Sequence, residues 1–381
     1  MTPSYTPAHG VQRIYDSSQR PSSRPGPDVI ALSSGDPDFD TPQHIRQALI
    51  DAIESGFTHY IEQQGDPELR AAIASVASKL TTTPVTEREV VVTHGGAGAL
   101  TAGIFSVINP GDRVLIPEPT YSSYADLLRL IGAEPVFLAQ TADFHLDLDR
   151  IRTEAPGARM IIICNPNNPT GVVYNRKELQ EVAAIANEHD LYVMSDEAYE
   201  ALVFDGVDFT STLEIPELRD RLIYCQTFSK RYAMTGWRLG YLIAPADLAT
   251  HAATVHRTLN GAGNAAVQRA AVAALTVPSD APEQMRQEYQ ARREIVAELL
   301  AGTPGAEVRE PDGSFYYFIK VSSPKAPEEI LPVALDYGVA VREGTEYGPG
   351  GAGYFRITFA TDRERLTEGV RRLRRMIESW A

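Results

Sequence analysis

TFSKRYAMTGWRLGY, residues 227–241, links two short apolar runs, LIYCQTF (222–228) and LGYLIAP (239–245). Both runs are rich in branched and aromatic side chains, which is typical of β-strands. Lys230 stands two residues after the first run. A lone lysine is most often a solvated surface residue, so the meaning of Lys230 depends on what the rest of the chain places near it.

Five further apolar runs precede this segment, and longer helical patterns lie between them. In RKELQEVAAIANEHD (176–190), for example, apolar residues recur at helical spacing. Short strands that alternate with helices predict an α/β fold with a mostly parallel sheet covered by helices. The unbroken apolar run MIIIC predicts a strand buried on both faces. The five runs are VVTHGG (91–96), RVLIPEP (113–119), PVFLA (135–139), MIIIC (160–164) and LYVMSD (191–196).

The length of 381 residues predicts two domains, because one hydrophobic core rarely serves so long a chain. From about Ala281 the pattern changes to a long charged helix, three strand-like runs and a basic closing helix, which indicates a smaller α+β domain. We therefore expect a large domain over residues 41–285 that carries a seven-stranded sheet. Residues 286–381 are expected to form the small domain, with residues 1–40 as an N-terminal arm that packs on it or on a partner subunit.

Charge and composition exclude several classes of partner. The formal net charge is −15, and a surface that follows phosphates needs a basic excess, so nucleic acid and anionic membranes are not expected partners. No apolar run approaches the ~20 residues of a membrane span, and no signal peptide is visible. Cys164 and Cys225 form neither a disulfide framework nor a zinc site, and His59 and His94 lack further ligands at metal spacing. We expect a cytoplasmic protein without a metal.

Polar residues follow three of the apolar runs where each strand would end. NPNNPTG (165–171) follows MIIIC, DEAY (196–199) follows LYVMS, and Lys230 follows LIYCQTF. Ligands of open parallel sheets bind at the carboxyl ends of the strands. Singly, these segments read as a turn, a helix N-cap and a surface lysine. Together they offer an amine, a carboxylate and polar donors, the groups that pyridoxal phosphate requires from its protein.

The order NP-x-NPTG, DE-x-Y and SK-x-x-x-MTGWR-x-GY resembles the class I and II aminotransferases, which are fold-type-I pyridoxal-phosphate enzymes, over essentially the whole chain. The resemblance implies that Lys230 holds the cofactor as a Schiff base and later moves the Cα proton. It implies that Asp196 keeps the pyridine nitrogen protonated. Tyr199 and Asn168 match the donors to the phenolate oxygen of the cofactor.

The resemblance also implies a cradle for the cofactor phosphate. THGGAGAL (93–100) reads as a glycine-rich turn that opens a helix, whose free N–H groups and dipole favour an anion. Tyr60 matches a tyrosine that the family lends to the phosphate of the neighbouring subunit, which implies a homodimer with shared active sites. The candidate phosphate ligands are Gly96, Ala97, Gly98, Thr227, Arg238 and Tyr60.

Arg356 lies in the otherwise apolar run GYFRITFA (353–360), where an unpaired guanidinium is costly and implies an anionic partner. A structural ion pair is the alternative. The resemblance makes Arg356 the clamp for the substrate α-carboxylate, helped by Asn168 and the backbone of Gly35. Tyr121 matches the residue that stacks on the cofactor ring, although an isolated aromatic more often packs in a core. An amino acid and a 2-oxo acid are thus the expected substrates.

The sequence departs from the family pattern in three places. GAGNAAVQ (261–268) lacks the serine that usually contacts the phosphate across the dimer. Ala97 stands where a lysine or threonine is common, so specificity for aspartate by that route is not expected. Arg342, Glu343 and Glu346 add charge before Arg356. This charge either favours a cationic or polar substrate or belongs to a solvated loop.

Amino-group transfer is therefore the leading functional hypothesis. A lyase, cyclase or β/γ-substitution enzyme is the alternative, because one scaffold hosts many reactions and the same cofactor residues serve them. A non-catalytic regulator is a third reading. It is disfavoured because residues 1–40 lack the basic helical pattern of a DNA-binding domain. The substrate side chain stays open.

Overall fold

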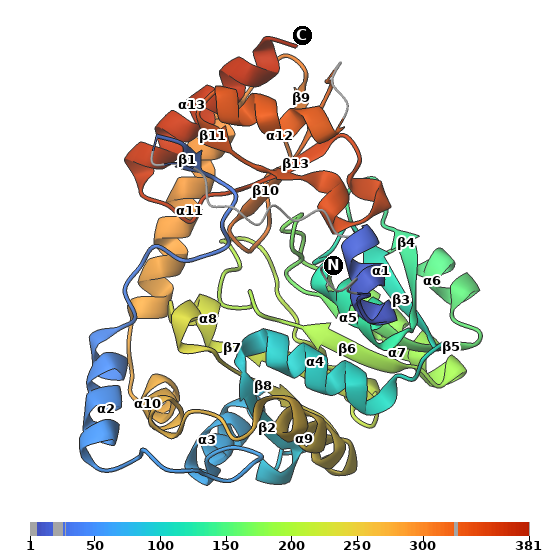
Figure 1. The fold of residues 1–381 in the computed structure, drawn as a ribbon, viewed down its shortest axis with the longest axis vertical. Helices are drawn as coiled ribbons and strands as arrows, with labels where there is room; N and C mark the ends of the chain where they lie inside the picture. The colour runs from blue at the N-terminus through green and yellow to red at the C-terminus, as the bar shows by residue number, and fades with distance from the viewer. Residues whose placement is uncertain (1–5, 18–25, 27, 324–326, 381) are drawn as a thin grey trace, which may run out of the picture.

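The computed structural model describes residues 6–17, 26, 28–323 and 327–380 (Figure 1). Its largest sheet has seven strands in the order β2-β8-β7-β6-β5-β3-β4. All pairs are parallel except those that β8 makes with β2 and β7. The strands are β2 Val90–His94, β3 Arg113–Glu118, β4 Glu134–Ala139, β5 Ala158–Cys164, β6 Tyr192–Asp196, β7 Leu222–Thr227 and β8 Leu239–Ile243. Each coincides with one of the seven predicted runs, so the predicted fold class is confirmed.

The middle strand β5 shows why an unbroken apolar run belongs in this sheet. Successive side chains of a strand point to opposite faces. Ile161 and Ile163 accordingly enter one hydrophobic core, whereas Met160, Ile162 and Cys164 enter another. All five are buried, as expected for a strand covered on both sides.

Helices cover the two faces of this sheet. The core that contains Ile162 takes buried residues from α4, α5 and α9, and the core that contains Ile161 takes them from α2, α3, α6, α7 and α10. The helices are α2 Gln43–Glu54, α3 Pro67–Ala77, α4 Gly95–Val107, α5 Ser123–Ile131, α6 Leu148–Glu154, α7 Arg176–His189, α8 Phe228–Arg231, α9 Ala246–Asn260 and α10 Ala265–Thr276. Short 3-10 turns are η1 Glu87–Glu89, η2 Thr212–Glu214, η3 Pro216–Leu218, η4 Thr235–Trp237, η5 Gly344–Tyr347 and η6 Pro349–Gly351.

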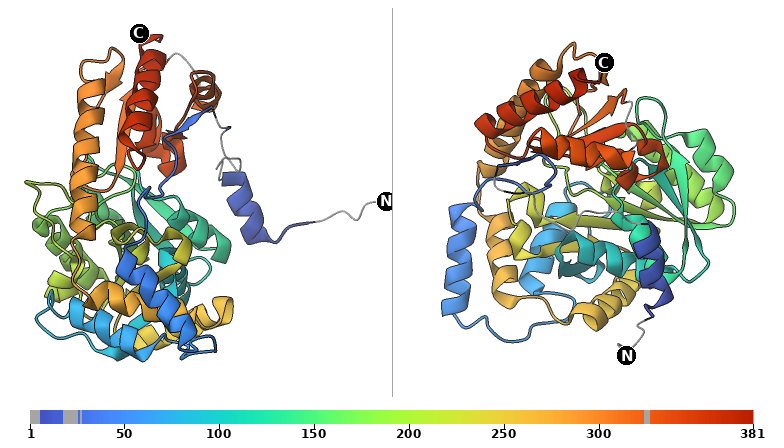
Figure 2. Two further views of the ribbon diagram at one scale, coloured as in Figure 1. Left: turned by 90° about the vertical axis from the view of Figure 1, so that its left-hand side faces the viewer. Right: turned by 45° about the horizontal axis from the view of Figure 1, so that its top comes forward.

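The C-terminal part has its own sheet and core. Its antiparallel strands follow the order β12-β13-β10-β9, and β1 pairs in parallel with β11. The long helix α11 connects it to the seven-stranded sheet (Figure 2). Its elements are α11 Ala281–Leu300, β9 Ala306–Glu307, β10 Tyr316–Val321, α12 Pro327–Asp336, β11 Val339–Ala340, β12 Arg342–Glu343, β13 Tyr354–Thr358 and α13 Arg363–Glu378, with β1 Ile30–Ala31 from the N-terminal region.

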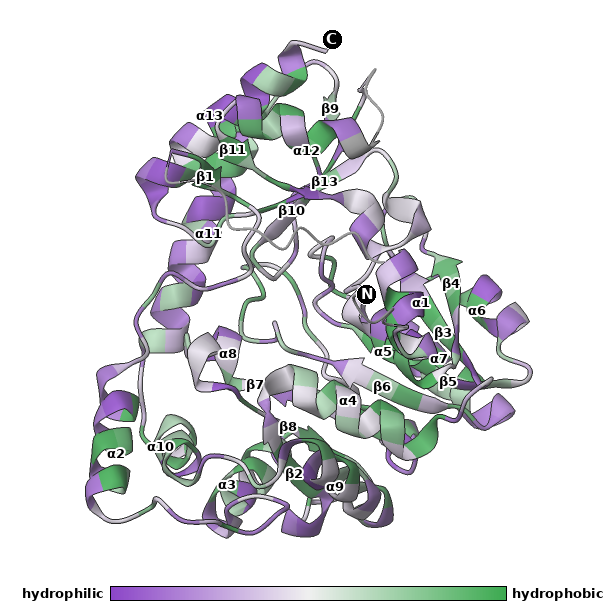
Figure 3. Ribbon diagram, viewed as in Figure 1, coloured by the Kyte–Doolittle hydropathy of each residue, from purple (hydrophilic) through white to green (hydrophobic). Residues whose placement is uncertain are grey.

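The N-terminal region divides between the two parts. β1 joins the C-terminal part, whereas helix α1 (His9–Ser17) lies against α5, where the Arg13 Nε donates a hydrogen bond of 2.9 Å to the carbonyl of Arg129. Hydrophobic residues gather on the central strands, and hydrophilic ones are frequent along α11 and α13 (Figure 3). Within the described residues, no helix combines the length and apolar character that a bilayer crossing requires.

Candidate active site

A cavity of about 440 Å³, here called the central cavity, lies where the carboxyl ends of β5, β6 and β7 face the C-terminal sheet. All the predicted site residues except Gly98 and Tyr60 line it. They come from separate segments of the chain, which the parallel strands and β13 bring together. The predicted residues in the lining are Gly35, Gly96, Ala97, Tyr121, Asn168, Asp196, Tyr199, Thr227, Lys230, Arg238 and Arg356.

Lys230 enters the cavity from the short helix α8, which begins directly after β7 because the Thr227 hydroxyl caps it by accepting from Ser229 N at 3.2 Å. The Lys230 Nζ donates to the carbonyl of Gly35. Burial lowers the pKa of the Lys230 amine to about 8, with Arg356 and Arg238 acting in the same direction and Asp36 opposing them. The amine is thus neutral, and nucleophilic, at a mildly alkaline pH.

Asp196 is the last residue of β6, and its carboxylate borders the cavity. It accepts hydrogen bonds from the Tyr124 hydroxyl at 2.7 Å and from Ala198 N at 3.2 Å. Burial raises the pKa of the Asp196 carboxyl, although these two bonds oppose the shift. A carboxylate in this position gains from a cationic partner in the cavity. Sequence reasoning missed Tyr124. Its only signal is the spacing Tyr121-x-x-Tyr124 at the start of a helix.

Groups suited to an anion lie at one end of the cavity. Gly96 and Ala97 form the first turn of α4, and the Thr227 hydroxyl and the Arg238 guanidinium lie beside it. A Cβ atom at Gly95 would come within 2.8 Å of Arg238 Nη2, so a side chain there would displace the guanidinium. Free helical N–H groups beside a guanidinium bind phosphate well.

Gly98, the next residue of α4, is not among the residues that line the cavity. A Cβ atom at Gly98 would meet Thr93 at 3.2 Å, and the Cβ of His94 and the ring of His256 lie on the same side. His256 Nε2 accepts a hydrogen bond from His94 N at 3.1 Å. Burial lowers the pKa of His256 to about 4, which keeps the ring neutral and able to accept. His256 thereby holds the residue that precedes the glycine-rich turn, and no local sequence signal marks it.

Arg356 projects from β13 into the opposite side of the cavity. Its Nη1 donates to Asn168 Oδ1 at 3.1 Å and its Nη2 to the Ser33 carbonyl at 2.9 Å. Its guanidinium carbon lies 4.0 Å from the ring centroid of Tyr316 and 5.1 Å from that of Tyr347. Among the described residues, no carboxylate pairs with it, so the structural ion pair considered above is not formed. Its buried Nε has no partner either.

The predicted residues Tyr199, Gly35 and Tyr121 each lie next to another tyrosine. The hydroxyls of Tyr199 and Tyr316 lie 3.2 Å apart, and a Cβ atom at Gly35 would come within 2.1 Å of the Tyr316 oxygen, which explains why glycine stands there. The ring of Tyr121 borders the cavity and meets Tyr124 edge to face, with 5.5 Å between centroids. Sequence reasoning missed Tyr316, since an aromatic run in a strand does not reveal which face each ring takes.

Tyr60 lies outside the cavity of its own chain and is 97% exposed. In the segment 261–268, which departs from the family pattern, Asn264 caps α10 by accepting from Val267 N at 3.0 Å. Arg342 and Glu346 both line the central cavity and form an ion pair of 3.4 Å. These two charges therefore belong to the cavity wall and not to a solvated loop.

Comparisons with known proteins agree with this geometry. The sequence model of the family "Aminotransferase class I and II" matches residues 27–373. An aspartate aminotransferase of Pyrococcus horikoshii is 35% identical over 361 residues, which cover 92% of this chain and 91% of the relative. An aromatic-amino-acid aminotransferase of Thermococcus litoralis is 36% identical over 363 residues, 92% of each chain.

The fold is also similar to solved structures. The crystal structure of an aromatic aminotransferase from Pyrococcus horikoshii matches with a TM-score of 0.90 and 34% identity, covering 97% of this chain and 99% of that one. None of these three relatives is named as a lyase or cyclase, so the alternative reaction class has no support. The chain belongs to the class I and II aminotransferases and is an enzyme that transfers an amino group from an amino acid to a 2-oxo acid.

Proposed function

We propose that the central cavity binds pyridoxal phosphate, held by Lys230 as a Schiff base, and that the enzyme uses it to move the α-amino group of an amino acid to a 2-oxo acid. The observation that carries the proposal is the buried Lys230 amine. Its pKa of about 8 and its place among Asp196, Arg238 and Arg356 suit an amine that must be neutral in order to react.

The residues of the cavity fit this cofactor. A volume of about 440 Å³ is in the range of small-molecule sites. Asp196, whose pKa is raised by burial, would gain a cation from the protonated ring nitrogen. Gly96, Ala97, Thr227 and Arg238 would hold the phosphate, and Tyr121, Asn168 and Tyr199 would contact the ring. When bound, the cofactor supplies an electron sink for the Cα carbanion.

The substrate residues lie across the cavity. The guanidinium of Arg356, without a carboxylate partner in the described chain, would bind the α-carboxylate of the amino acid, and Asn168 and the backbone of Gly35 would close around it. Lys230, once released, would take the proton from Cα, since a pKa lowered to about 8 leaves part of the amine neutral near neutral pH. The backbone N–H of Gly98, in the same first turn of α4, would also contact the phosphate.

The active unit proposed is a cytoplasmic homodimer in which Tyr60 reaches the phosphate of the neighbouring subunit. Its support is the exposure of Tyr60 and of two isoleucines of the nearby helix α2, Ile50 and Ile53, which are 48% and 52% exposed. We also propose the division of the chain into a large domain, residues 41–285, and a small domain, residues 286–381, with the arm 1–40. The separate core of the C-terminal sheet supports this division.

The test is a half-reaction. The purified yellow enzyme is mixed with single amino acids and no 2-oxo acid, and the cofactor spectrum is followed. Conversion to pyridoxamine phosphate, reversed by a 2-oxo acid, supports the proposal and names the donor. Return of the starting spectrum together with ammonia or a cleaved product contradicts it.

A further inference from the structure

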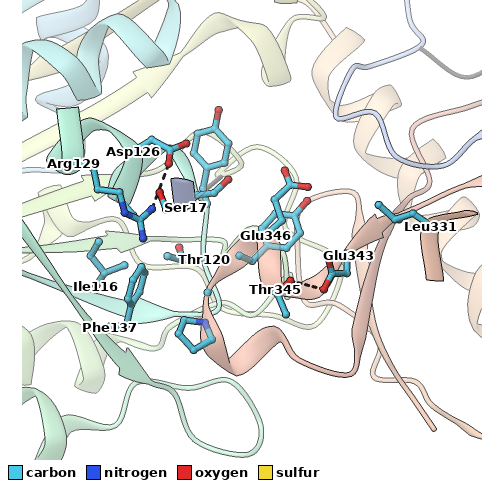
Figure 4. Close-up of a pocket in the computed structure, with 16 residues that line it drawn as sticks. Ser17, Ile116, Thr120, Asp126, Arg129, Phe137, Leu331, Glu343, Thr345 and Glu346 are labelled. Atoms are coloured by element: carbon cyan, nitrogen blue, oxygen red, sulfur yellow. Dashed lines mark hydrogen bonds and ion pairs between the residues drawn. The ribbon is translucent and has the colours of Figure 1, made fainter. Parts of the chain in front are cut away.

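A second cavity adjoins the central one. This cavity, here called the side pocket, has a volume of about 490 Å³ and lies between α5 and the segment Glu343–Pro349 (Figure 4). It shares Tyr121, Glu346 and Tyr347 with the central cavity. The shared residues stand next to the proposed substrate clamp, because the Tyr347 ring contacts Arg356. The side chain of a substrate whose α-carboxylate binds Arg356 would therefore reach the side pocket.

The walls of the side pocket are acidic. Its lining has three carboxylates, Asp126, Glu343 and Glu346, against the guanidinium of Arg129. Counting also Arg342, which pairs with Glu346 from the central cavity, the formal charge is −1. Arg129 pairs with Asp126 at 3.5 Å (Figure 4). The side chain of Glu346 is 15% exposed, pairs with Arg342, and stands where the two cavities meet. A partly buried carboxylate at that place attracts cations more strongly than a solvated one, because the local dielectric is lower.

The cationic groups of the central cavity are already engaged. Lys230, Arg238 and Arg356 serve the proposed cofactor and α-carboxylate, and Arg342 pairs with Glu346. No guanidinium of the described lining is therefore left over for a second carboxylate on the substrate. This arrangement disfavours an acidic side chain.

The acidic wall is held in place by the large sheet. Thr120 N donates to the Tyr347 carbonyl at 2.8 Å, and the carboxylate of Glu118 accepts from Gly350 N at 2.7 Å. Glu118 is the last residue of β3, and Thr120 follows it by two positions. Because these bonds already fix the segment that carries Glu346, less conformational entropy is lost when a substrate binds.

We propose that the side pocket binds the side chain of the amino-acid substrate and that Glu346 selects for a distal cationic group, such as guanidinium. This inference rests on the proposed transaminase function and deepens it by naming the substrate class. Glu346 is a specificity residue here. Asp126 and Glu343 contribute charge further from the α-carbon.

The test compares arginine with citrulline, which has nearly the same shape and a neutral urea group in place of the guanidinium. With the cofactor-loaded enzyme, we expect kcat/KM for arginine to exceed that for citrulline by about tenfold or more, the size of one well-placed charge contact. In Glu346→Gln this ratio falls to near one, whereas Glu346→Asp keeps most of it. The ratio is measured within each variant, so a loss of folded enzyme does not change it.

Glu368→Gln is the matched control. Glu368 also pairs with an arginine four residues away, Arg372, but lies on α13 outside both cavities. In Glu368→Gln, we expect the ratio of kcat/KM for arginine to kcat/KM for citrulline to equal that of the parent enzyme. A second readout is calorimetric binding of the two amino acids to Lys230→Ala, which performs no transfer, where arginine should again bind more tightly.

Equal or better use of citrulline by the parent enzyme overturns the inference, and so does a ratio that survives in Glu346→Gln. If alanine and citrulline still convert the cofactor in those cases, the proposed function stands and only the selectivity is wrong. If no amino acid converts the cofactor, the proposed function fails and takes this inference with it.

Discussion

Tyr124, at the start of α5, donates a hydrogen bond of 2.7 Å to the carboxylate of Asp196 at the end of β6, across 72 positions of the chain. Burial raises the pKa of the Tyr124 hydroxyl well above its ordinary value, so the tyrosine remains a donor. Burial raises the pKa of Asp196 as well, and the hydrogen bond opposes that rise by stabilising the charged form. The hydrogen bond thus favours the charged form of a buried carboxylate.

Replacing Tyr124 with Phe removes this bond and leaves the cavity shape intact. A hydrogen bond to a charged group contributes about 1.5–3 kcal/mol, so kcat is expected to fall about tenfold to a hundredfold. The KM of the amino donor should change little, because Arg356 is untouched. Steady-state kinetics and a pH titration of the cofactor absorbance measure the two effects, and a change in KM alone would contradict the positioning role.

Lys230 predicts a pH dependence for cofactor loading. Its pKa is lowered to about 8, so the amine is protonated below that pH and neutral above it. The rate at which apoenzyme forms the Schiff base with pyridoxal phosphate should rise with pH and level off above about 8, well before the value of roughly 10.4 for a free lysine. Stopped-flow absorbance measures this rate. A rate that keeps rising to pH 10 would show that the cavity does not lower the pKa.

Arg356→Lys keeps the positive charge but loses the two-pronged geometry that suits a carboxylate. We expect kcat/KM for the amino donor to fall about a hundredfold or more, since truncating a buried charged contact costs roughly 2–5 kcal/mol. The loss should appear mainly in KM, and the spectrum of the bound cofactor should stay unchanged. Arg152→Lys, an exposed position that pairs with Glu181 and Glu188, is the matched control.

Gly35→Ala tests the close approach to Tyr316. The new Cβ atom would lie 2.1 Å from the Tyr316 oxygen, so the ring or the Gly35 segment must shift. Overpacking of this kind costs about 1–3 kcal/mol, and we expect a lower melting temperature with a raised KM. Adding Tyr316→Phe removes the clashing oxygen and should restore part of the stability. A double-mutant cycle measures this coupling, and fully additive effects would place the cause elsewhere.

Much of the site was visible in the sequence because its residues sit at strand ends within short motifs. Asp196 is the last residue of β6, and Lys230 lies three positions after the end of β7. A run of apolar residues marks each strand. The role of Tyr60 is harder to predict from local sequence, because the proposed contact needs a second chain. Gly98 is predicted to bind the phosphate with its neighbours Gly96 and Ala97, and the direction of its Cα–Hα bond toward Thr93 and His256 became visible only in the folded chain.

The amino-acid sequence alone was enough to specify the seven-stranded α/β sheet and the family, because strand and helix periodicities and the motifs around Lys230 are local properties of the chain. It did not reveal that Tyr124 supports Asp196, that His256 holds the glycine-rich turn, or that Glu346 stands between two cavities. Tyr124 and Asp196 are 72 positions apart in the chain, and His94 and His256 are 162 positions apart. Packing of whole helices and sheets sets such contacts, and only the folded chain brings the partners within bonding distance.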